Sequence, residues 1–134
     1  MKKKVYLLLF SVLICGCTSV KKELIPTNNK GGYILTLSEN NQKGKVLISG
    51  KVVDVKTNEP LSNTQLFIGC AKTITSKNGE YSFKVNKSEV KQYIEVSTIG
   101  YKKIKTNFLK LNDKTNLKID FFLEEDDSLL IDCN

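Results

Sequence analysis

The sequence predicts an antiparallel β-sandwich after residue 43. Apolar and polar residues alternate at period two in six runs between Val46 and Leu123, which is typical of strands that bury one face. Turn signals rich in Asn, Pro and Gly separate these runs, and none of them shows helical periodicity. Short alternating strands joined by turns are typical of two packed antiparallel sheets.

The six runs follow one another with a turn between most of them. The residues expected on the buried face are Val46, Ile48, Gly50 and Val52; Leu66 and Ile68; Tyr81, Phe83 and Val85; Ile94, Val96 and Thr98; Ile104, Thr106 and Phe108; and Leu117, Ile119, Phe121 and Leu123. Turns are expected at Asn58-Glu59-Pro60, Lys77-Asn78-Gly79, Ile99-Gly100 and Asn112-Asp113. The sandwich is therefore predicted over residues 44–124, a length that can fold alone.

The N-terminus has the order of parts of a secretory signal. Lys2, Lys3 and Lys4 precede an apolar run from Val5 to Cys15, as in a positively charged n-region followed by an h-region. The run is about half the roughly 20 residues that a transmembrane helix needs. Residues 1–16 are therefore predicted to be a helical signal peptide.

The end of this segment, Leu13-Ile14-Cys15-Gly16-Cys17, resembles the bacterial lipobox. In that pattern a small residue precedes the cysteine that receives the lipid. Gly16 precedes Cys17, whereas the bulky Ile14 precedes Cys15, so the resemblance implies that Cys17 is the lipidated residue. Two or three acyl chains would then attach the protein stably to a membrane.

Residues 17–43 are predicted to be the lipidated N-terminus and a tether, because they are polar and rich in Pro, Gly and Asn. The interruption Tyr33 to Leu37 is apolar enough to form an extra edge strand instead, and the sequence leaves this open. Residues 18–22 contain no acidic cluster, which favours an outer-membrane protein that faces the periplasm over one exposed at the cell surface.

The composition excludes several chemistries. The chain has no His and no Arg, so it has no Ser–His–Asp triad, no ordinary catalytic zinc site and no guanidinium fork for phosphate. We therefore expect no catalytic residues, no metal site and no cofactor. A nucleic-acid partner is not expected either, because the chain is exported and lacks a basic motif with interleaved aromatic residues.

Charge is unevenly distributed along the chain. The region from Gly44 to Leu123 has 14 Lys against 7 acidic residues, whereas Glu124 to Asn134 has five acidic residues and no Lys. A basic, solvated domain surface and an acidic C-terminal tail over residues 125–134 are expected. The tail lacks the alternating ligands and the turn Gly of a calcium loop.

Several motifs together resemble the carboxypeptidase-regulatory-like domain. They are Ile48-Ser49-Gly50-Lys51-Val52-Val53-Asp54, Thr57-Asn58-Glu59-Pro60-Leu61, Thr64-Gln65-Leu66-Phe67-Ile68, Thr73-Ile74-Thr75-Ser76-Lys77-Asn78-Gly79-Glu80-Tyr81-Ser82-Phe83, Ile94-Glu95-Val96-Ser97 and Ile99-Gly100-Tyr101. The resemblance covers residues 45–124 and implies a seven-stranded sandwich of transthyretin-like topology. It also implies an accessory or binding module without catalytic residues.

Five motif residues have a structural explanation. Gly50 lets a neighbouring backbone or large side chain approach its strand. Asn58 and Ser76 stand where the family often has Gly and Asp, and both suit a turn. Gly79 supplies the positive φ of a tight hairpin. Tyr101 is expected to pack its ring at a corner and to keep its hydroxyl near water.

Cys70 and Cys133 are the cysteines that remain after Cys17 is lipidated. In an oxidising compartment they are candidates for a disulfide, and the alternative is a buried free thiol at Cys70 with a loose one at Cys133. Spacing along the chain does not decide between these alternatives.

Two functions follow from the sequence. The preferred one is a non-catalytic lipoprotein, attached to the membrane by its lipid, that presents the sandwich to another envelope protein or polysaccharide. The alternative is a glycan- or small-ligand-binding lipoprotein that assists nutrient uptake, for which Tyr33, Tyr93 and Tyr101 are candidates for a sugar platform. A transthyretin-like hydrolase is disfavoured, because its chemistry uses His and Arg.

Overall fold

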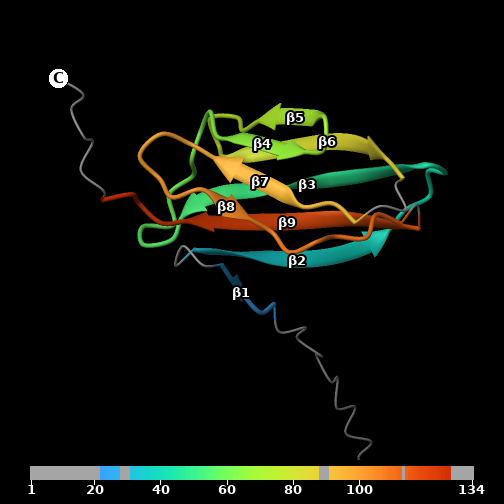
Figure 1. Ribbon diagram of the computed structural model, residues 1–134, viewed down its shortest axis with the longest axis horizontal. Helices are drawn as coiled ribbons and strands as arrows, with labels where there is room; N and C mark the ends of the chain where they lie inside the picture. The colour runs from blue at the N-terminus through green and yellow to red at the C-terminus, as the bar shows by residue number, and fades with distance from the viewer. Residues whose placement is uncertain (1–21, 28–30, 88–90, 113, 128–134) are drawn as a thin grey trace, which may run out of the picture.

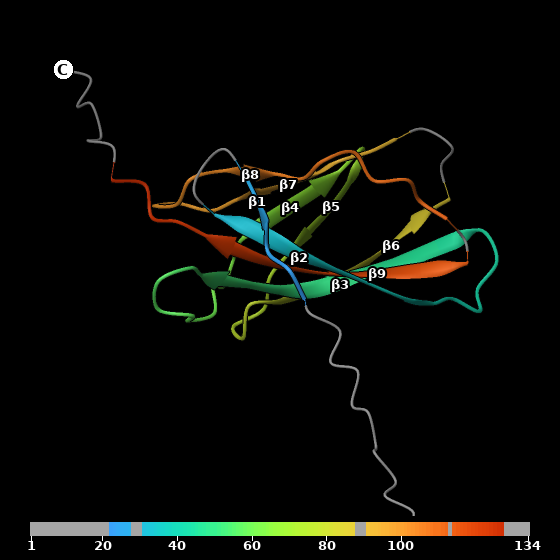
Figure 2. The same cartoon turned by 90° about the horizontal axis from the view of Figure 1, so that it is seen from below.

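The computed structural model describes residues 22–27, 31–87, 91–112 and 114–127. They form a sandwich of two β-sheets, which Figures 1 and 2 show face-on and edge-on. The strands are β1 (Ile25–Pro26), β2 (Gly32–Glu39), β3 (Lys45–Asp54), β4 (Gln65–Ile68), β5 (Ala71–Ile74), β6 (Glu80–Asn86), β7 (Ile94–Ser97), β8 (Ile104–Lys105) and β9 (Thr115–Leu123). The all-β sandwich expected from the sequence is thus confirmed.

One sheet has the strand order β1-β2-β9-β3-β6, and the other has the order β5-β4-β7-β8. Neighbouring strands are antiparallel except β3 and β9, which are parallel. The described residues therefore form nine strands instead of the expected seven. The predicted helical signal peptide, residues 1–16, lies outside the described residues, which include no helix long and apolar enough to cross a bilayer.

The extra strand left open at Tyr33 to Leu37 is present and belongs to the fold. β2 pairs with β9 along its whole length, from Gly32 opposite Phe122 to Glu39 opposite Thr115. β1 pairs with its other side, so β2 is not the outermost strand. Two segments of the predicted tether, Ile25–Pro26 and Gly32–Glu39, are therefore strands of the sandwich. The sequence does not predict this, because a short apolar segment between Gly- and Asn-rich flanks carries no sign of its distant partner strand.

The core confirms the period-two pattern in most strands. The fully buried residues with large side chains include Ile48, Leu66, Ile68, Ile94, Ile104, Ile119, Phe121 and Leu123. Phe108 was expected beside Ile104 in the core, but it is 66% exposed. The prediction fails there because β8 is only two residues long, and the chain leaves the sheet before the alternation reaches Phe108.

The backbones of β3 and β9 approach each other closely at Gly50. A Cβ atom placed on Gly50 would lie 1.8 Å from the carbonyl oxygen of Ile119, so only Gly fits at this position. The Tyr81 hydroxyl donates a hydrogen bond of 2.7 Å to the same oxygen. Burial, followed by the charge of Asp120, raises the pKa of Tyr81 well above its ordinary value, which keeps the hydroxyl protonated as a donor. The close backbone approach predicted at Gly50 is confirmed.

Substituting Tyr81 with Phe is expected to destabilise the fold by about 1–3 kcal/mol, because the buried carbonyl of Ile119 would lose its partner. Urea unfolding of the wild type and the variant measures this difference. Tyr93→Phe is the matched control, since Tyr93 is partly exposed and should change stability little. Equal stabilities for the Tyr81 and Tyr93 variants would contradict the account.

Candidate functional site

Two surfaces, one on each sheet, have the features of a binding site. The first begins at the turn between β5 and β6, where the Ser76 hydroxyl accepts hydrogen bonds of 3.3 Å from the backbone N–H groups of Asn78 and Glu80. Gly79 completes this turn with a φ of 71°. The capping role expected for Ser76 is confirmed, and the turn places Asn78 above the end of the larger sheet.

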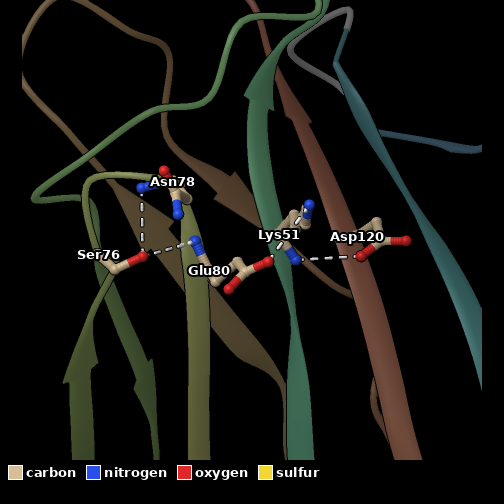
Figure 3. A network of polar contacts seen from close by, with 5 residues as sticks. All are labelled: Lys51, Ser76, Asn78, Glu80 and Asp120. Carbon is tan, nitrogen blue, oxygen red and sulfur yellow. Dashed lines mark hydrogen bonds and ion pairs between the residues drawn. The ribbon is translucent and has the colours of Figure 1, made fainter.

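Polar side chains from three strands continue from this turn across the sheet, as Figure 3 shows. The Lys51 ammonium on β3 lies 3.3 Å from a carboxylate oxygen of Glu80 on β6. The backbone N–H of Lys51 donates to Oδ1 of Asp120 on β9 at 3.0 Å. Both members of the ion pair are more than half exposed, so the pair contributes little stability.

The hollow beside this network, here called the Lys51 hollow, has a volume of about 450 Å³. Its lining residues are Lys51, Val53, Asn58, Pro60, Asn78, Asp120 and Phe122. Apolar residues and short polar side chains therefore meet in one concave surface. Small-molecule sites have this composition and fall in this range of volumes.

The second surface is the outer face of the four-stranded sheet, whose opposite face is buried in the sandwich. We call it the aromatic–lysine face and define it by Phe67, Lys72, Lys91, Tyr93, Lys105 and Phe108. Lys72 of β5 lies opposite Phe67 of β4 in the register, and Glu95 of β7 lies opposite both Phe67 and Lys105 of β8. One row of side chains therefore crosses all four strands.

Rings and ammonium groups contact one another on this face. The Lys105 ammonium lies 3.6 Å from the ring centroid of Tyr93, and the Lys72 ammonium lies 5.3 Å from that of Phe67. The rings of Tyr93 and Phe108 meet edge to face, with centroids 5.9 Å apart. A hollow of about 260 Å³ lies between Phe67, Lys91 and Tyr93. The face thus combines aromatic surface with positive charge.

A third cluster, at the end of β3, is structural. Asp54 is buried, and its carboxylate accepts hydrogen bonds from the backbone N–H groups of Lys56 and Thr57 and from the Tyr101 hydroxyl. The Tyr101 hydroxyl therefore does not point to water as expected. The backbone N–H of Thr57 is the largest contributor that lowers the pKa of Asp54, against the opposing effect of burial. The cluster joins two loops of the sandwich.

The structure describes one of the three predicted cysteine sites. Cys17 and Cys133 lie outside the described residues, so the lipidation and the disulfide remain predictions. Cys70 is exposed, whereas the free-thiol alternative expected it to be buried. It follows β4, and Figure 1 shows the turn between β4 and β5 at the opposite end of the sandwich from the end of β9.

The three tyrosines proposed as a sugar platform do not share a surface. Tyr33 is 2% exposed, and its hydroxyl accepts a hydrogen bond from the backbone N–H of Asn107. Tyr101 is held by Asp54, so only Tyr93 lies on an open face. The platform fails because Tyr33 belongs to β2, whose pairing with β9 turns the ring into the core.

Sequence reasoning missed Phe67 and Phe108 as surface aromatics. Phe67 alternates with buried Leu66 and Ile68, and this pattern does place it on the outer face. The convergence of Phe67 with Phe108, which comes from a different part of the chain, has no signal in the sequence. Within the described residues, no group of three or more His, Cys, Asp and Glu side chains is arranged to hold a metal ion.

The two sheets and their exposed surfaces define the chain as a β-sandwich domain with open sheet faces. The CarboxypepD_reg-like domain model matches residues 48–132, and the chain belongs to this family. The family resemblance expected from the sequence is thereby confirmed. No curated protein matches the chain.

The solved structures that are similar to the chain include the following two. One is a membrane-associated protein of unknown function from Bacteroides fragilis NCTC 9343, with 19% identity and a TM-score of 0.50 over 63% of this chain and 29% of that one. The other is 3-chlorocatechol 1,2-dioxygenase from Rhodococcus opacus 1CP, with 13% identity and a TM-score of 0.48 over 66% of this chain and 64% of that one. The chain spans less than two thirds of either protein, and at such identity a likeness concerns the fold alone.

Replacing Asp54 with Asn is expected to lower stability at pH 7 by about 1.5–3 kcal/mol, the range for hydrogen bonds to a charged group. The pKa of Asp54 is lower in the folded protein than in the unfolded chain, where it is near 4. The ionised carboxylate therefore stabilises the fold at pH values above about 4, and this stabilisation is lost as the pH falls through the folded-state pKa. The difference in unfolding free energy between wild type and variant should therefore shrink below about pH 4. A difference that stays constant from pH 7 to pH 2 would contradict the assignment.

Proposed function

We propose that this protein is a non-catalytic, membrane-anchored lipoprotein that presents its β-sandwich as an interaction module in the cell envelope. The observation that carries the proposal is the aromatic–lysine face, where Phe108 is 66% exposed although it is a large apolar side chain. Exposed apolar side chains gathered on one face are typical of interaction sites. The absence of His and Arg from the sequence also favours binding over catalysis.

Lipidation of Cys17 would hold the domain close to its membrane. Seven residues separate Cys17 from Ile25, where β1 begins, and this stretch spans at most about 30 Å. The fold is also found in the membrane-associated protein from Bacteroides fragilis, which is consistent with such a location. We propose attachment to the outer membrane on its periplasmic side.

A second candidate function is the binding of a small ligand or glycan that assists nutrient uptake. The Lys51 hollow favours it, because Phe122 and Val53 offer an apolar surface and Asn58, Asn78 and Asp120 offer hydrogen-bonding groups in the same depression. This function uses the opposite sheet from the aromatic–lysine face. The two candidates can therefore be separated by substitutions on one sheet at a time.

Replacing Cys17 with Ser is expected to move the protein from the membrane fraction to the soluble fraction and to abolish incorporation of labelled palmitate. The physical reason is the loss of the acyl chains, which contribute about 0.8 kcal/mol for each buried methylene. Cys15→Ser is the matched control and should keep both label and membrane attachment. Continued labelling of the Cys17 variant would contradict the anchor.

Capture of cross-linked envelope material by the lipidated protein distinguishes the two candidate functions. We expect the wild type to retain a partner, Phe108→Ala to retain several-fold less, and Asn78→Ala to retain as much as the wild type. Phe108 and Asn78 are both exposed side chains outside the core, and neither has a positive φ, so neither substitution should unfold the domain. Loss of binding with Asn78→Ala alone would instead support the ligand-binding candidate.

A further inference from the structure

We infer that the aromatic–lysine face binds an acidic polysaccharide, a polymer whose sugar rings carry carboxylate groups. The inference rests on the proposed interaction function and names the class of partner. It is drawn from the arrangement of charge and aromatic rings across the four strands.

The positive charge on this face is mostly without carboxylate partners. The aromatic rings of Phe67 and Tyr93 are the partners of Lys72 and Lys105, and neither ammonium forms an ion pair with a carboxylate among the described residues. The acidic side chain in the row, Glu95, is paired with Lys103 at 3.0 Å. An ammonium that lies over a ring keeps donors for an incoming anion, so the face is complementary to a negatively charged ligand.

The charges are spaced across the sheet and do not form a single cluster. Lys72 and Lys105 lie on the two edge strands β5 and β8, with β4 and β7 between them. Three strand spacings separate the two backbones, a distance of about 14 Å. A ligand that contacts both ammonium groups must therefore be extended and carry more than one anionic group, as a polymer does.

The aromatic rings favour a sugar polymer over an acidic protein. The ring of Tyr93 meets the ring of the largely exposed Phe108, and the Lys105 ammonium lies over the ring of Tyr93. The apolar C–H face of a sugar ring can pack on such rings while its carboxylate reaches an ammonium. The core of a protein interface, by contrast, is depleted of Lys, and here Lys72 and Lys105 lie over the rings.

The face is also open to a large ligand. Figure 2 shows β1 in the five-stranded sheet, with the four-stranded sheet as the opposite layer. The first strand that the structure describes therefore does not cover the aromatic–lysine face.

The test is equilibrium binding of the full mature chain to polygalacturonate, with dextran as the neutral polymer and vesicles containing anionic phospholipid as the membrane probe. We expect binding to polygalacturonate that weakens with salt, and none to dextran or to the vesicles. The double variant Lys72→Gln/Lys105→Gln should weaken binding about tenfold or more, and Phe108→Ala should weaken it several-fold. The charge-matched control is Lys45→Gln/Lys84→Gln, two exposed positions on the other sheet, and it should bind like the wild type.

Four results would overturn the inference. Equal weakening by the control double variant would show that net charge alone attracts the polymer, and equal binding to dextran would show that carboxylates are not recognised. Binding to anionic vesicles without binding to polygalacturonate would assign the face to a membrane. If the wild type still captures an envelope protein through Phe108 but binds no acidic polymer, the inference fails and the proposed function stands; if it captures nothing, both fail.

Discussion

The carbonyl oxygen of Ile119 lies where a Cβ atom of Gly50 would stand, and the arrangement of the larger sheet depends on this close approach. The parallel register of β3 and β9 runs through Ser49 opposite Lys118 and resumes at Val52 opposite Phe121. Between these pairs, the Tyr81 hydroxyl and the Asp120 carboxylate supply hydrogen bonds to the two backbones. Without the Tyr81 hydroxyl, the buried carbonyl oxygen of Ile119 would lose this partner at the centre of the sheet.

The close approach of β3 and β9 affects both faces of the five-stranded sheet. On the inner side, Tyr81 contacts the ring of Phe121, which also contacts Tyr33 of β2, so the aromatic core links three strands. On the outer side, the Asp120 carboxylate that accepts from the Lys51 backbone also lines the Lys51 hollow. The features that hold β3 and β9 together thus shape one of the two candidate surfaces.

The sequence could predict the elements whose burial alternates over several residues. Runs such as Leu117 to Leu123 report which face is buried, because side chains in a strand alternate between the faces. The roles of Gly50 in a close backbone approach and of Ser76 in capping a turn were also predictable, because each depends on the residue's size or on its immediate neighbours in the chain. The fold class and the turns followed from signals of this kind.

Pairings between distant segments could not be predicted. Tyr33 and Phe121 are opposite one another in β2 and β9, yet nothing near Tyr33 in the chain indicates that partner. Phe108 shares the alternation of β8, and only the early end of that strand exposes it. The aromatic–lysine face has the same origin, because its rings and lysines come from four strands and the loops beside them.

The two sheets divide the roles that the account assigns to the protein. The five-stranded sheet receives the chain from the predicted anchor through β1, and the four-stranded sheet presents an uncovered face with rings and ammonium groups. Neither role requires a catalytic group.

The claim that the aromatic–lysine face is the binding surface is tested most directly by backbone amide NMR. The mature protein is titrated with solubilised envelope material, and the perturbed amides are mapped residue by residue. The account predicts that shifts and line broadening concentrate at Phe67, Lys72, Tyr93, Lys105 and Phe108, while Lys51, Asn58 and Asp120 stay unchanged. Perturbations confined to the Lys51 hollow, with the four-stranded sheet unaffected, would contradict it.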